Sequence, residues 1–123
     1  MDIPGRLYEH GEEVYTDWFP RQGDGIILRL QAIDRKGSNI KSKIEVYTKN
    51  AEDTGAGTAI SGWEKETDTP GTVYELIKVS DATGGGGAGL KEMVRLKVST
   101  ASGSDGDWIL ARIFPPIFFD AAG

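Results

Sequence analysis

Apolar and polar residues alternate along much of this chain with the two-residue period of a β-strand. The strongest example is Gly25–Asp34, where one face is wholly apolar and is predicted to point into a core. Ile40–Lys49 alternates as cleanly, with lysines outward, which is typical of an antiparallel strand with one face in water. The predicted inward positions of these two strands are Ile26, Leu28, Leu30, Ala32, Ile40, Ser42, Ile44, Val46 and Thr48.

A glycine-rich loop separates the next two predicted strands. Thr72–Ser80 and Leu90–Ser99 are predicted to pair as a hairpin in the middle of a sheet, joined by Asp81–Gly89. Within the loop, Gly84, Gly86 and Gly89 have the spacing of a dinucleotide-binding motif. That motif needs a helix at its end. Since Leu90–Ser99 has a strand period, the sequence favours a flexible loop and predicts no cofactor.

Four further strands are predicted, over Arg6–His10, Val14–Phe19, Ala59–Lys65 and Trp108–Phe114. Pro115 and Pro116 should end the last of them, because proline has no backbone N–H. The pattern predicts an all-β fold: an antiparallel β-sandwich, jelly-roll or Ig-like, of about seven or eight strands. Residues 1–123 are predicted to form a single β-sandwich domain with extended N- and C-terminal segments.

Two of the tryptophans carry predictions about exposure. Trp108 lies on an apolar face and is predicted to belong to the core. Trp63 is flanked by Gly62 and Glu64 and is predicted to be exposed, and therefore available to a partner.

Composition narrows the classes of partner. The net charge of −5 argues against nucleic acid, which needs a basic field. No apolar run approaches the ~20 residues that a membrane helix needs, so no membrane is expected as a partner. The chain has no cysteine, and its first residues show no secretion signal.

Residues with catalytic or metal-binding chemistry are few. His10 is the single histidine, and no serine-hydrolase or zinc-protease motif accompanies it. Asp105 and Asp107, with Ser104, offer oxygens suited to calcium, but Asp-Gly is also an ordinary turn and most of a calcium loop is missing. We therefore expect no enzyme, no catalytic residue, no metal and no cofactor.

The segment after Pro116 is unusual because a terminus is normally polar. Ile117, Phe118 and Phe119 must be buried, either on their own sandwich or on a neighbouring subunit. In its general features, and in the stretch Ile113–Phe119, the chain resembles the small β-sandwich decoration and cement proteins of tailed-phage capsids. That resemblance implies a structural assembly protein that forms homo-oligomers or binds a capsid or other protein shell, located in the virion or the cytoplasm.

The predicted partner-binding residues are Ile117, Phe118, Phe119 and Trp63. An alternative function is a carbohydrate-binding or adhesive module, with a glycan as partner. It would present its tryptophans and tyrosines on one sheet face or loop rim.

Overall fold

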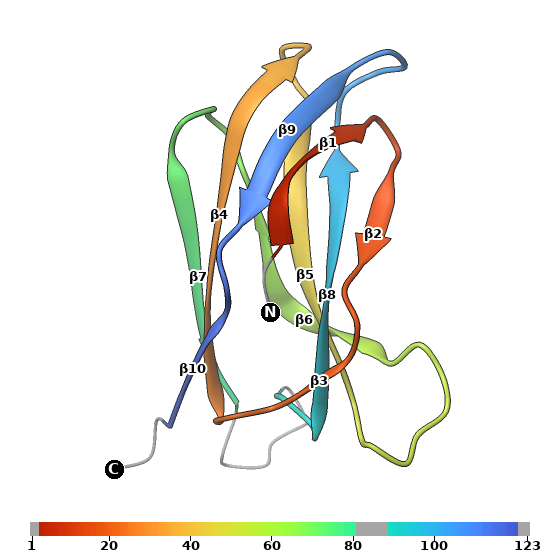
Figure 1. Cartoon of the computed structure of the whole chain (residues 1–123), viewed down its shortest axis with the longest axis vertical. Coiled ribbons are helices and arrows are strands. Elements are labelled where there is room, and N and C mark those ends of the chain that lie inside the picture. Colours follow the sequence, from red (N-terminus) through yellow and green to blue (C-terminus); the bar gives the residue numbers. More distant parts are fainter. Residues whose placement is uncertain (1–2, 81–88, 121–123) are drawn as a thin grey trace.

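The computed structural model describes residues 3–80 and 89–120, which form two antiparallel sheets packed face to face (Figure 1). Within these ranges every regular element is a strand, so none of them is a helix able to cross a membrane. The predicted all-β sandwich is confirmed. The strands are β1 (Ile3–Glu9), β2 (Glu13–Tyr15), β3 (Phe19–Pro20), β4 (Gly25–Lys36), β5 (Lys41–Lys49), β6 (Thr58–Glu66), β7 (Val73–Val79), β8 (Met93–Ala101), β9 (Trp108–Ile113) and β10 (Ile117–Phe119).

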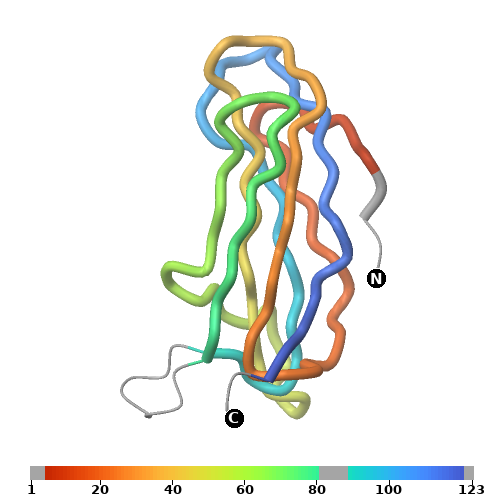
Figure 2. Tube along the Cα trace, turned by 90° about the vertical axis from the view of Figure 1, so that its left-hand side faces the viewer, coloured from red at the N-terminus to blue at the C-terminus, as the bar shows by residue number. Residues whose placement is uncertain are grey.

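The first sheet, sheet A, is built on the long strand β4. One edge of β4 pairs with β7, from Gly25–Val79 to Gln31–Val73. The other edge pairs with β10 and then with β9, and β1 adds to the far side of β9. Figure 2 shows β9 and β10 as one blue path running beside the orange β4. The break between them falls at Pro115 and Pro116, as the sequence predicted.

The second sheet, sheet B, has the order β2-β8-β5-β6, with β3 also pairing with β8. It repeats the design of sheet A, since β2 and β3 are short collinear strands on one edge of the long β8. At the break between β2 and β3, Thr16 accepts a hydrogen bond from the Leu96 N–H at 3.0 Å through its side-chain hydroxyl. The Thr16 N–H donates to the Leu96 carbonyl, also at 3.0 Å.

The core lies between the sheets and is filled by alternate residues of the long strands. Every inward position predicted on Gly25–Asp34 and Ile40–Lys49 is buried. Ser42 and Thr48 are the inward hydroxyl residues on β5, and the Ser42 hydroxyl is satisfied by a 2.9 Å hydrogen bond to the buried Thr67 hydroxyl. Further core side chains come from β8 and β9: Val94, Leu96, Val98, Ile109, Ala111 and Ile113.

The predicted hairpin of Thr72–Ser80 with Leu90–Ser99 is wrong. β7 pairs with β4 in sheet A, whereas β8 pairs with β5 in sheet B, so the connection between them passes from one sheet to the other. The turn after β4 does the same, because β4 and β5 also lie in different sheets. The glycine motif Gly84–Gly89 falls almost wholly on residues 81–88, which lie outside the described residues.

The prediction for Trp108 is also wrong. The inward face of β9 consists of Ile109, Ala111 and Ile113, and Trp108 is only partly buried. Both faces of this strand looked apolar in the sequence, so alternation alone did not distinguish the inner one.

Candidate interaction surface

The outer face of sheet A carries an apolar patch at the end where β10 joins β4. Ile27 of β4 is paired with Ile77 of β7 on one side and with Ile117 of β10 on the other. Directly opposite residues in adjacent strands point to the same face, so the three side chains form one row across the sheet. The neighbouring row consists of Val79 and Phe119 on either side of Gly25. We call these five apolar residues the isoleucine patch: Ile27, Ile77, Val79, Ile117 and Phe119.

The patch is open to solvent. Ile77 keeps 55% of its surface exposed, Ile117 45% and Val79 43%. Seven large apolar side chains are exposed in the described part of the chain, and six of them belong to strands of sheet A. A clustered apolar surface of this kind is typical of a site that binds protein.

The C-terminal residues predicted to bind a partner divide between two faces of β10. Phe118 points inward, packs against the core and contacts the Phe19 ring edge-on, with 6.1 Å between the ring centroids. Ile117 and Phe119 point outward into the patch. The segment therefore folds back on its own sandwich, and two of its three apolar side chains also remain on the surface.

Phe119 reaches the sheet because the residues opposite it are glycines. A methyl group at Gly25 would overlap the Phe119 ring, and one at Gly23 would lie 2.6 Å from the Phe119 carbonyl oxygen. The ring thus lies over the bare backbone of β4. The local sequence Gly23–Asp24–Gly25 has the composition of an ordinary turn, and its two glycines also leave the space that Phe119 occupies.

Trp63 does not belong to the surface, and the prediction that it is exposed is wrong. Its side chain is 4% exposed and lies in the core. The pairing of β6 with β5 shifts between Glu45 and Tyr47, and Gly62 has a φ of +82° in the same stretch. This bulge changes the side-chain alternation and turns the indole inward.

The open edge of β7 lies next to the patch. Among the described residues, β7 is hydrogen-bonded to β4 and to no strand on its other edge. Figure 1 shows it at the left margin of sheet A. Other edges carry features that discourage pairing: β1 has Pro4 and an irregular register, and β6 has its bulge. Across its length β7 has no proline and a regular register, with Lys78 as its single lysine.

The outer face of sheet B is different, because ion pairs cover it. Lys41 lies 2.8 Å from Asp68, and Lys43 lies 2.9 Å from Glu64. The hydrogen bond to Lys41 lowers the pKa of Asp68, and the one to Glu64 raises the pKa of Lys43. These contacts support the interpretation of the predicted lysine stripe as a solvated face.

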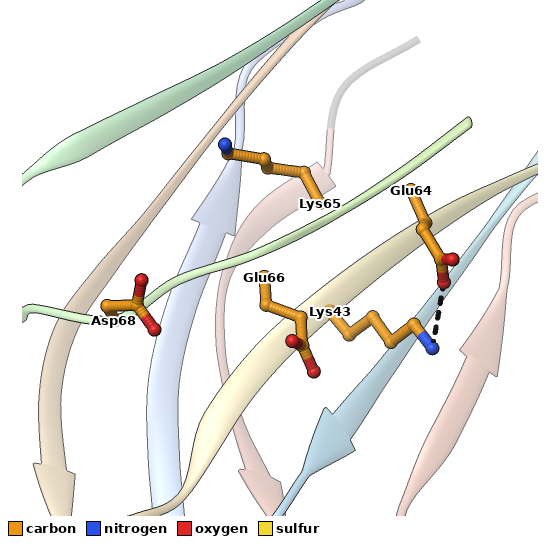
Figure 3. Close-up of a pocket in the computed structure, with 5 residues that line it drawn as sticks. All are labelled: Lys43, Glu64, Lys65, Glu66 and Asp68. Atoms are coloured by element: carbon orange, nitrogen blue, oxygen red, sulfur yellow. Dashed lines mark ion pairs between the residues drawn. The ribbon is translucent and has the colours of Figure 1, made fainter. Parts of the chain in front are cut away.

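A shallow hollow of about 400 Å³ lies on this charged face (Figure 3). The side chains of Lys43, Glu64 and Glu66 lie along one side, whereas Lys65 points away from them. Lys65 instead lies 5.9 Å from the centre of the Tyr74 ring. Among the described residues no group of three or more acidic, histidine or cysteine side chains is arranged to hold a metal, so the hollow offers mixed charge without a cation site.

The candidate calcium loop is a turn held by its own carboxylate. The Asp107 carboxylate accepts from the Ser104 N–H at 2.9 Å, and the Asp107 N–H donates to the Ser104 carbonyl at 3.0 Å. His10 lies beside this loop, with its Nδ1 3.5 Å from the carboxylate of the fully exposed Asp105. A contact to a fully exposed carboxylate contributes little to holding the imidazole in one orientation.

Compared with known proteins, the chain matches no family model and no curated protein sequence.

Replacing Gly25 with alanine should displace the Phe119 ring. We expect the free energy of unfolding to fall by about 1–3 kcal/mol, because the new methyl group overlaps the ring. Urea unfolding measures the loss, and amide exchange at residues 117–119 should accelerate. Gly5→Ala is the control, since its methyl group would lie 3.8 Å from Ile33, an ordinary contact.

A double-mutant cycle tests the cause. In a Phe119→Ala background the Gly25→Ala loss should shrink markedly. An undiminished loss would show that the glycine acts through some contact other than the ring.

Lys97 should make stability depend on alkaline pH. Its hydrogen bond to Glu13 raises its pKa from 10.5 to about 12. The folded pKa lies above the unfolded one, so the stabilisation is fully present below pH 10.5 and is lost as the pH rises through 12. We expect Lys97→Met to lower the free energy of unfolding at neutral pH by about 1–2 kcal/mol.

Between pH 10.5 and 12 that difference from the wild type should close. Urea unfolding over this range measures it, with Lys36→Met at an exposed position as the control. A constant difference across the range would contradict the assignment.

Proposed function

We propose that this chain is a non-enzymatic assembly protein that associates with a second copy of itself through the open edge of β7, at the Ile77 end of the isoleucine patch. The observation that carries the proposal is the position of Ile77. It is the most exposed of the large apolar side chains that the structure describes, and it lies on the edge strand β7 at the end of the isoleucine row. The patch and the edge are thus two parts of one continuous surface.

A second copy is the partner that this surface fits best. Edge strands pair readily with identical strands, and two antiparallel β7 strands related by a twofold axis would join both copies of sheet A. With the axis beside Ile77, each Ile77 lies opposite its counterpart. The row from Ile117 through Ile27 to Ile77 then continues into the same row of the second copy, in reverse order.

Charges next to the patch support a self-complementary contact. Arg29 and Glu75 form a 2.7 Å ion pair in the row adjoining the isoleucines. Because each copy carries both signs at this place, a twofold arrangement does not force like charges together. Binding to a larger shell, which the resemblance to capsid decoration proteins implies, stays a prediction.

Charging the centre of the surface should separate the copies. We expect the wild type to run as a dimer in size-exclusion chromatography with light scattering. Ile77→Lys should weaken the dimer at least about tenfold, since it places two like charges on the axis. The control is Ile33→Lys, at a position of sheet A that is 45% exposed but lies outside the patch. A monomeric wild type would overturn the proposal.

These substitutions are better probes than deletion of the C-terminal segment. Deletion would also remove Phe118, which packs against the core. If the truncated protein failed to dimerise, the cause could be either partial unfolding or loss of the contact between copies, and the experiment would not distinguish them.

The twofold register has its own test. Opposed residues on paired antiparallel strands have Cα atoms about 4.5–5.5 Å apart, which a disulfide spans. The chain has no cysteine, so Ile77→Cys introduces a single thiol. We expect mild oxidation to link two copies rapidly through residue 77, whereas Ile33→Cys should react slowly. Equal rates would contradict the register.

A further inference from the structure

A row of alternating cations and aromatic rings crosses the outer face of sheet B. At its centre the Arg95 guanidinium lies 4.3 Å from the centre of the Tyr15 ring and 4.8 Å from that of Trp18. Lys49 continues the row beyond Trp18 at 4.7 Å, and Lys97 continues it beyond Tyr15 at 5.9 Å. We call the following residues the aromatic–cation row: Lys49, Trp18, Arg95, Tyr15, Tyr47 and Lys97.

Strand register brings these residues together. Arg95 of β8 is paired with Tyr47 of β5, and Lys97 of β8 is paired with Tyr15 of β2. The rings of Tyr15 and Tyr47 meet edge-on, with their centroids 5.7 Å apart. Trp18 comes from the break between β2 and β3, where the chain leaves its ladder with β8. Four separate segments therefore build one platform.

The lysines at the ends of the row already have partners. Lys97 lies 2.5 Å from the Glu13 carboxylate and 3.8 Å from that of Glu45. The Lys49 ammonium donates to the carbonyl of Asp53 at 3.2 Å, in the loop after β5.

Arg95 is different from both lysines. No carboxylate of the described residues lies within 4.0 Å of it, and its hydrogen bond goes to the Ala56 carbonyl at 3.0 Å. The Nε atom of Arg95 is buried, and it has no hydrogen-bond acceptor among the residues that the structure describes. Aromatic rings thus hold the guanidinium in place, and its charge is not neutralised.

This chemistry suits a ligand that carries a carboxylate on a ring. A planar guanidinium pairs with a carboxylate through two parallel hydrogen bonds, and aromatic side chains pack against the flat face of a sugar. Tyr15 is 41% exposed, and its ring lies in contact with the Arg95 guanidinium, so one ligand can reach both groups. A hollow of about 320 Å³ adjoins the Lys49 end, lined in part by Lys49 and Ala56, and gives room for a second residue of a glycan.

We propose that the aromatic–cation row binds an acidic sugar, with its carboxylate on Arg95 and its ring against Tyr15 and Trp18. The surrounding charges favour a single carboxylate over a polyanion. Glu13 and Glu45 lie at the Lys97 end, and Asp53 lies in the loop beyond Lys49. The site is on the opposite sheet from the isoleucine patch, so it can act whether or not the chain dimerises.

Titration of the intact protein with two pairs of probes tests the proposal. Sialyllactose and glucuronic acid carry the carboxylate, while lactose and glucose are their neutral counterparts. We expect the Trp18 indole signal in a ¹H–¹⁵N NMR spectrum to shift with both acidic probes, at least about tenfold more strongly than with the neutral ones. No shift with either acidic probe, or equal shifts with a neutral counterpart, would overturn the proposal.

Arg95→Met should abolish the shift, and Arg95→Lys should weaken it several-fold because a lysine lacks the planar fork. Arg112→Met is the matched control, since Arg112 lies 4.6 Å from the Phe114 ring but on sheet A. Thermal unfolding of each variant confirms that it is folded. Unchanged binding by Arg95→Met would overturn the assignment. Tighter binding of a glutamate-rich peptide than of either sugar would also overturn it, in favour of an acidic protein partner.

Discussion

The structure depends on hydrogen-bonding the backbone N–H and C=O groups along both edges of β4. A central strand cannot leave its backbone N–H and C=O groups unpaired, because burying them without partners is costly. β7 covers one edge, and the other is covered by two separate strands, β9 and β10, with the proline pair between them. This arrangement delivers Ile77 and Ile117 to either side of Ile27. The apolar row on the outer face is thus a direct result of the way in which the central ladder is completed.

The outer faces of the two sheets differ in the kind of side chain that covers them. On sheet B, long charged side chains neutralise one another across the strands, and cations lie against the aromatic rings between them. On sheet A, branched apolar residues occupy the corresponding outward positions at one end. A sandwich needs one apolar face per sheet, so a second apolar face is an addition that stability of the lone domain does not require. This contrast motivates placing the partner on sheet A.

Periodicity predicted most strands and the inward faces of β4 and β5, because a two-residue period follows directly from strand geometry. It did not predict which sheet each strand joins. The polar turn after β4 and the loop after β7 both had the appearance of hairpin connections, yet each crosses between sheets. Turn composition reports where a strand ends, and the direction of the next strand depends on packing between distant segments.

The candidate site was only half predictable for the same reason. Ile117 and Phe119 were recognised as apolar residues near a terminus, but Ile27 and Ile77 become their neighbours only through long-range register. Trp63 was misplaced because a bulge breaks the alternation that the prediction assumed. The aromatic–cation row was missed although its signal was present. Tyr47 lay at a predicted outward position, and its partners Arg95 and Tyr15 come from strands remote in sequence.

The split edge of β4 also has a consequence for the order of folding. β4 is made early, but the strands that complete one of its edges, β9 and β10, come at the other end of the described chain. Contacts between segments so distant in sequence form slowly, because a long loop must close first. During synthesis the backbone groups on that edge of β4 therefore stay unpaired until β9 and β10 have been made. Pairing of this edge with the β10 segment of another nascent chain would exchange β10 between the two copies, which is the misassembly that the late synthesis of β10 favours.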